Sequence, residues 1–170
     1  MSVTDQLLAN NQRYAASFDK GNLPTPPGKK LAVLACMDAR LDVHRILGLE
    51  EGEAHVIRNA GGVVTEDAIR SLVISQKLLG TEEIVLIHHT ECGMLTFKDD
   101  EVKEQIEAET GIRPAFALEA FPDVEEDVRQ SIARIQASPF IPRKSQIRGF
   151  VYDVKSGRLN EVGVPATAAR

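Results

Sequence analysis

Two continuous apolar runs, residues 31–35 (LAVLA) and 84–87 (IVLI), constrain the fold more than any other feature of the sequence. Strands of this kind are buried on both faces, as in parallel sheets that are covered by helices. Between the runs, the pattern predicts a short helix at 43–47, a strand at 54–57 and an amphipathic helix at 66–79. Because strands that alternate with helices indicate right-handed crossover connections, we predict a single α/β domain with a central, mostly parallel β-sheet flanked by helices.

The segments around this sheet complete one domain of 170 residues. A predicted helix at 4–18 belongs to an N-terminal helical arm at 1–20, and its apolar stripe is so thin that we expect it to lie on a partner subunit. The core at 30–96 is followed by C-terminal helices and a hairpin at 97–165. Within that last part we predict a charged helix at 98–109, a helix that Asp123 caps, and antiparallel strands at 149–154 and 159–164.

Composition and charge exclude several classes of protein. The 20 basic and 25 acidic residues give a formal net charge of −5, and the chain has no Trp and 2 Tyr. A nucleic-acid partner is therefore not expected. No apolar run approaches the roughly 20 residues that span a bilayer, and the first residues are too polar for a signal peptide. We expect no membrane association and a cytoplasmic location, and 2 cysteines are too few for a disulfide-stapled scaffold.

Both cysteines follow predicted strands: Cys36 the first, and Cys92, with His89, the third. The carboxyl ends of parallel strands meet at one edge of a sheet, so these side chains are expected to converge. Two thiolates and one imidazole suit Zn²⁺, and three protein ligands leave a fourth position open, as in catalytic zinc sites. His88 competes with His89, but the spacing from His89 to Cys92 is the usual chelate spacing, which leaves His88 packed or hydrogen-bonded on the other side. Buried structural cysteines and a disulfide between them are the alternatives.

A carboxylate and a guanidinium lie directly after the first cysteine, in the order Cys36, Met37, Asp38, Ala39, Arg40. In an irregular turn, Asp38 can reach either the metal or Arg40. A bidentate pair with Arg40 would keep Asp38 ionised and directed away from the metal. A surface ion pair with no catalytic role is the alternative interpretation.

Three short motifs, taken together, resemble those of the β-class carbonic anhydrases, in particular their short bacterial form. They are CxDxR (Cys36, Asp38, Arg40), RNAG at 58–61 and HxxC (His89, Cys92). The resemblance implies one Zn²⁺ per chain, held by Cys36, His89 and Cys92, with Asp38 and Arg40 as a catalytic dyad beside it. In a closed state, Asp38 would become the fourth ligand. The resemblance also implies a homodimer, or a dimer of dimers, whose N-terminal helices embrace the neighbouring subunit.

The activity that the resemblance implies is the zinc-dependent, reversible hydration of CO₂ to bicarbonate and a proton. Zinc lowers the pKa of its bound water, and the resulting hydroxide attacks CO₂. Plant-type members carry a pocket glutamine at the position of Pro27, so we predict that backbone amides at Gly61 or Gly62 bind the substrate instead. The apolar candidates for lining the pocket are Met37, Val63, Val64, Met94 and Leu95.

Two alternatives share this motif set. Some relatives hydrolyse carbonyl sulfide or carbon disulfide, which are linear molecules that the same zinc site can attack. In the second alternative, the chain is a noncatalytic zinc-binding module in which Asp38 occupies the fourth site. Because two thiolates neutralise Zn²⁺, whereas three histidines leave it doubly charged, its bound water should be less acidic than in a three-histidine site. We therefore predict that CO₂ hydration rises with pH through the alkaline range.

Overall fold

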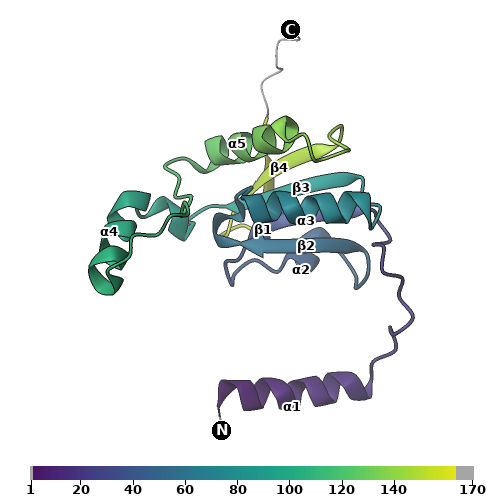
Figure 1. The fold of residues 1–170 in the computed structure, drawn as a ribbon. Coiled ribbons are helices and arrows are strands. Elements are labelled where there is room, and N and C mark those ends of the chain that lie inside the picture. Colours follow the sequence, from purple (N-terminus) through teal and green to yellow (C-terminus); the bar gives the residue numbers. More distant parts are fainter. Residues whose placement is uncertain (1, 164–170) are drawn as a thin grey trace.

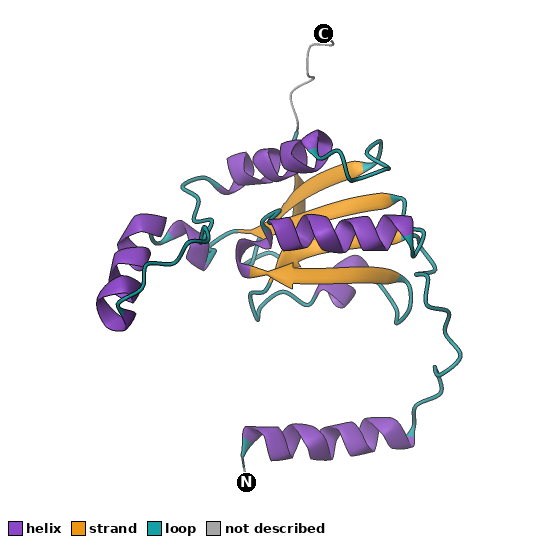
Figure 2. Ribbon diagram, in the orientation of Figure 1, coloured by secondary structure: helices purple, strands orange, loops and turns teal. Residues whose placement is uncertain are grey.

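A five-stranded sheet forms the centre of the computed structural model, which describes residues 2–163 (Figures 1 and 2). Its strand order is β2 (Ala54–Asn59), β1 (Leu31–Cys36), β3 (Glu83–His89), β4 (Ile147–Tyr152) and β5 (Leu159–Glu161). The first four of these are mutually parallel, and β5 is antiparallel to β4. The predicted α/β sheet and C-terminal hairpin are confirmed. The first hairpin strand, β4, has the expected length but begins two residues earlier than predicted, and β5 is shorter than expected; residue 164 of the predicted second strand lies outside the described residues.

Helices cover both faces of the sheet. Figure 1 shows α3 (Glu66–Lys77) and α5 (Val124–Ala137) on one face and α2 (Val43–Leu47) on the other. The Thr65 side chain accepts a hydrogen bond from the Ala68 N–H and so starts α3, and Asp123 accepts one from the Glu126 N–H and starts α5. These caps satisfy N–H groups that the first helical turn leaves without partners, as the sequence predicts.

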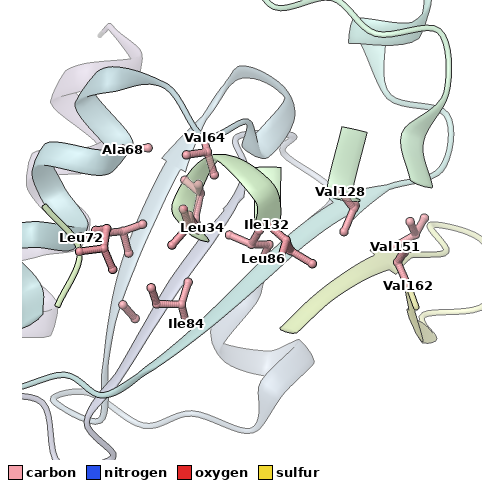
Figure 3. Packing of buried hydrophobic residues seen from close by; sticks show 13 residues of the cluster. Leu34, Val64, Ala68, Leu72, Ile84, Leu86, Val128, Ile132, Val151 and Val162 are labelled. Atoms are coloured by element: carbon pink, nitrogen blue, oxygen red, sulfur yellow. The ribbon is translucent and has the colours of Figure 1, made fainter. Parts of the chain in front are cut away.

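The buried apolar residues form one cluster on each face, because successive side chains of a strand point to opposite sides. On the first face, Leu34 of β1 and Leu86 of β3 pack with Leu72 of α3 and Ile132 of α5 (Figure 3). The second cluster contains Val33, Ala35 and Ile87 together with both cysteines and Val43 of α2. The cysteines therefore lie where the core of the second face meets the carboxyl ends of β1 and β3.

Two polar side chains of α3 are buried together with its apolar face. Ser75 lies 2.8 Å from His55 Nδ1 and 2.7 Å from the Thr81 hydroxyl. Gln76 donates to the Arg143 carbonyl and accepts from the Arg143 N–H. Each buried group has a partner, which removes most of the cost of taking it out of water.

Two helices project from this body in Figure 1. Helix α1 (Val3–Ala16) starts with a capping box between Ser2 and Asp5 and has no buried residue. Its Leu7 and Leu8 are 59% and 60% exposed. Helix α4 (Asp99–Thr110) also has no buried residue. No helix among residues 2–163 is long and apolar enough to cross a membrane.

The base of α4 is held by a single carboxylate. Asp99 accepts hydrogen bonds from the backbone N–H groups of Leu118, Glu119 and Ala120, at 2.8, 3.2 and 2.8 Å. Burial raises the pKa of Asp99, but these three donors outweigh it and leave the pKa below its ordinary value. The ionised carboxylate thus ties the start of α4 to the loop that follows it.

Candidate metal centre

Three side chains with metal-binding atoms meet at the carboxyl ends of β1 and β3. Cys36 ends β1, His89 ends β3, and Cys92 follows in the next turn. Their ligand atoms all lie within 4.8 Å of one another, and the two sulfur atoms are 4.0 Å apart. All three residues are buried. The convergence that the strand ends predict is therefore present.

The histidine of this triad presents a free nitrogen to the two sulfur atoms. His89 Nδ1 lies 2.8 Å from the Thr90 carbonyl oxygen, and only a protonated Nδ1 can donate to a carbonyl. The lone pair therefore lies on Nε2, which is buried and has no hydrogen-bond partner within the described part of the chain. An unpartnered imidazole nitrogen beside two thiols has the donor set and the hydrogen-bonded second nitrogen that zinc sites use. The residues present fit a zinc ion.

The pKa values of the two thiols are shifted in opposite directions. Their mutual hydrogen bond lowers the pKa of Cys36 and raises that of Cys92, because a single proton shared between the sulfur atoms stabilises one thiolate at the expense of the second. Backbone amides of Asp38 and Gly61 lower the pKa of Cys36 further. A metal ion would deprotonate both, since the thiolate is the form that binds metals.

The neighbouring His88 points away from the triad. Its Nε2 lies 2.7 Å from Asp127 Oδ2 of α5, and its ring lies against Phe121 at a centroid distance of 5.8 Å. Adjacent residues of a strand face opposite sides of the sheet, so only one of the two histidines can join the cysteines. The structure bears out the predicted hydrogen-bonded place of His88.

The carboxylate of Asp38 is held at the edge of the triad by Arg40. The Arg40 Nε and terminal nitrogen donate to its two oxygens at 2.9 and 2.8 Å, and the Arg40 N–H donates to Oδ1 at 2.9 Å. These bonds hold the pKa of Asp38 far below its usual range. Asp38 Oδ2 lies only 3.7 Å from His89 Nε2. The ionised carboxylate therefore lies beside the ligand atoms but is directed to Arg40.

Arg58 is a site residue that the sequence marks only as the first position of RNAG. Its guanidinium donates to the Cys36 carbonyl at 2.7 and 3.0 Å and to the Asp38 carbonyl at 2.7 Å. These hydrogen bonds hold the backbone of Cys36 and Asp38 in place. An arginine at a strand end can be a surface residue for many reasons. Nothing in the sequence pattern indicates that the carbonyl groups of Cys36 and Asp38 accept its hydrogen bonds.

The turn after β2 packs closely against the triad's backbone. Gly62 has a φ of 73°, and a Cβ there would lie 2.8 Å from Cys36 N and 2.9 Å from Ile87 O. Only glycine fits, because the left-handed conformation and the close approach both exclude a side chain. The backbone amide of the preceding Gly61 helps to lower the pKa of the Cys36 thiol. Substrate binding by either glycine stays a prediction.

The structure places the five apolar candidates for lining the pocket in different surroundings. Val63 and Met94 lie in the cluster that contains both cysteines, whereas Met37 is 63% exposed. Val64 packs instead in the cluster of the opposite face, beside α3 and α5. Leu95 is partly buried against the cluster that contains both cysteines, and it also borders a pocket of about 500 Å³ next to the start of α4. The expectation that Val64 lines the metal site is therefore wrong, since neighbouring residues of an extended segment point to opposite faces.

Comparison with known proteins agrees with the motifs. The family model described as carbonic anhydrase matches residues 31–159. Beta-carbonic anhydrase 1 of Mycobacterium tuberculosis is 64% identical over 162 residues, which cover 95% of this chain and 99% of that protein. The chain belongs to the β-carbonic anhydrase family. A crystal structure of carbonic anhydrase from Streptococcus mutans aligns with a TM-score of 0.90 at 45% identity, over 96% of this chain and 99% of that one.

The chain is also similar to a protein that is named for a different activity. A carbon disulfide hydrolase of Acidithiobacillus thiooxidans is 34% identical over 180 residues, covering 94% of this chain and 90% of that protein. The chain is thus more similar to this β-carbonic anhydrase than to this carbon disulfide hydrolase.

Proposed function

We propose that this protein is a zinc enzyme that reversibly hydrates CO₂ to bicarbonate and a proton. The observation that carries the proposal is the buried triad of two sulfur atoms and one lone-pair nitrogen, with an ionised carboxylate beside it that is paired to an arginine. Three protein ligands leave one position for a reactant, which is the arrangement of catalytic zinc sites. The 64% identity to a β-carbonic anhydrase supports the choice of substrate.

In this proposal Cys36, His89 and Cys92 hold one zinc ion per chain. A zinc ion held there would supply Lewis-acid chemistry, lowering the pKa of a bound water molecule. Asp38 would accept a hydrogen bond from that water and orient it toward CO₂, and Arg40 would keep Asp38 ionised and directed away from the metal. Small apolar residues such as Val63 exclude competing water from the substrate's side.

Zinc content and two substrate assays test the proposal together. We expect about one zinc per chain by elemental analysis, fast CO₂ hydration in a stopped-flow indicator assay, and much slower release of sulfide from COS or CS₂. Sulfide release that exceeds CO₂ hydration would make the protein a hydrolase of these sulfur compounds. Stoichiometric zinc without activity on any of them between pH 6 and 9 would instead leave a noncatalytic module in which Asp38 fills the fourth site.

We further propose that the active form is a homodimer or a dimer of dimers. Helix α1 exposes Leu7 and Leu8, and no residue of the described chain buries them. An apolar groove of about 940 Å³ between α3 and α5, lined among others by Val73 and Phe140, supports the packing of a second copy's α1. Two thiols that must stay reduced support a cytoplasmic location.

Substitutions within α1 test the dimer. Leu7→Ser with Leu8→Ser should convert the protein to monomers in sedimentation velocity, because it removes the apolar side chains that need cover. Asn11→Ser with Gln12→Ser changes two polar residues of the same helix and should leave the dimer intact. A dimer that survives the leucine substitutions would show that α1 does not join the subunits.

A further inference from the structure

Glu91, which lies between two candidate zinc ligands in the sequence, contacts Arg40 in two ways. It adopts a left-handed backbone conformation with a φ of 55°, which is unusual for a residue with a side chain. Its carbonyl oxygen accepts a hydrogen bond from an Arg40 terminal nitrogen at 3.1 Å. Its carboxylate Oε2 lies 3.7 Å from the other terminal nitrogen of Arg40. The guanidinium is therefore held by Asp38 on one side and by Glu91 on the other.

The other carboxylate oxygen of Glu91 is itself held by a lysine. Lys155 Nζ lies 2.5 Å from Glu91 Oε1. Lys155 belongs to the β4–β5 turn. This turn is fixed beside Thr90, the residue before Glu91, because the Val154 N–H donates to the Thr90 hydroxyl at 3.1 Å and the Thr90 N–H donates to the Tyr152 carbonyl at 2.9 Å. Glu91 thus lies between two cations, one of them anchored by a different part of the chain.

The place of Arg40 decides where Asp38 points. Asp38 Oδ2 lies 2.8 Å from Arg40 and 3.7 Å from His89 Nε2, so a modest rotation of the carboxylate separates a pair with Arg40 from a position among the ligand atoms. A group that holds Arg40 in place therefore favours the paired position. Loss of that group gives Arg40 more freedom and lets Asp38 compete for the fourth position.

We propose that Glu91 is a positioning residue that holds Arg40, with Lys155 orienting Glu91, and thereby sets the fraction of molecules in which the fourth position is open. This inference rests on the proposed zinc site. Glu91 and Arg40 are about half exposed, and exposed ion pairs are weak and screened by salt. We therefore expect a two- to fivefold effect on the ratio of open to closed molecules, largest at low ionic strength.

Cobalt(II)-loaded protein gives a readout that is independent of turnover. Azide binds the cobalt only when the fourth position is open, so its apparent affinity falls with the open fraction, and the visible spectrum reports whether a carboxylate has joined the metal. For Glu91→Gln we expect an apparent azide affinity that is weaker by up to fivefold at low ionic strength, a spectrum shifted toward that of Arg40→Ala, and an unchanged cobalt content. Sodium sulfate at high concentration should reduce the difference from the wild type.

A matched control and a charge exchange separate this role from a structural one. Glu125→Gln removes an exposed carboxylate that pairs with Arg129 on α5, and it should leave azide affinity unchanged. Exchanging Glu91→Lys with Lys155→Glu restores the ion pair to the turn but places a positive charge beside Arg40. If Glu91 acts on Arg40, the double variant stays at least as weak as Glu91→Gln.

The possible results distinguish a failure of the positioning role from a failure of the proposed function. Wild-type azide affinity in Glu91→Gln, or recovery in the charge-exchanged variant, would overturn the positioning role while the metal site and its activity stand. Wild-type protein that takes up neither zinc nor cobalt would overturn the proposed function itself, and with it this inference.

Discussion

Replacement of Gly62 by alanine tests how tightly the turn after β2 is packed against the backbone of the metal-binding triad. The added Cβ would lie 2.8 Å from Cys36 N and 2.9 Å from Ile87 O, and both of these atoms belong to central strands that cannot rotate away. A left-handed conformation costs a residue with a side chain about 1–2 kcal/mol. Overpacking adds about 1–3 kcal/mol. We therefore expect Gly62→Ala to lower the free energy of unfolding by about 2–5 kcal/mol, or roughly 4–20 °C in melting temperature.

Gly80→Ala is the matched control for this experiment. Gly80 has nearly the same φ, 74°, but a Cβ there would meet nothing within 4 Å. The difference between the two variants isolates the collision from the backbone conformation. Urea unfolding of both, after metal removal and at one protein concentration, measures it. Equal stability of the two variants would refute the close-packing argument, and an undiminished zinc affinity of Gly62→Ala would refute its link to the site.

Three further predictions concern the site and its surroundings. Arg40→Ala should lower CO₂ hydration about 100-fold with zinc content unchanged, because the freed Asp38 no longer orients the attacking water; full activity would contradict the role of Arg40. Asp99→Asn should destabilise the protein by about 1–2 kcal/mol at pH 7 in chemical unfolding. Since the pKa of Asp99 is lower in the folded chain, this contribution is present above its unfolded value and is lost as pH falls through the folded one, so the two proteins should converge in acid. The CO₂ hydration rate should rise with pH above neutrality, since two thiolates leave little charge to acidify the water; a rate that is flat from pH 7 upward would contradict this charge argument.

Local patterns in the sequence predict the centre of the fold and the three residues that meet at the candidate metal site. The apolar runs of β1 and β3 identify buried strands because few polar residues interrupt them, and their ends place Cys36, His89 and Cys92 together. Caps such as Thr65 act within three residues, so a linear pattern is sufficient to find them. The pair of Asp38 with Arg40 is equally local.

Partners that are distant in sequence could not be found in this way. The contact of His88 with Asp127 spans 39 residues and that of Gln76 with Arg143 spans 67, and no pattern on either segment marks the other. Buried polar residues of this kind look like surface residues until the fold supplies their partner. The same holds for Arg58, whose acceptors are carbonyl groups that every residue carries.

The uncovered arm has a consequence for how the protein folds. An isolated helix of 14 residues is only marginally stable in water, and α1 has no buried residue within its own chain. The sheet and its covering helices can form at a rate that is independent of concentration, whereas in the proposed dimer the arm would gain its packing only when two chains meet. We therefore expect two kinetic phases in refolding, of which only the slower one accelerates as the protein concentration is raised.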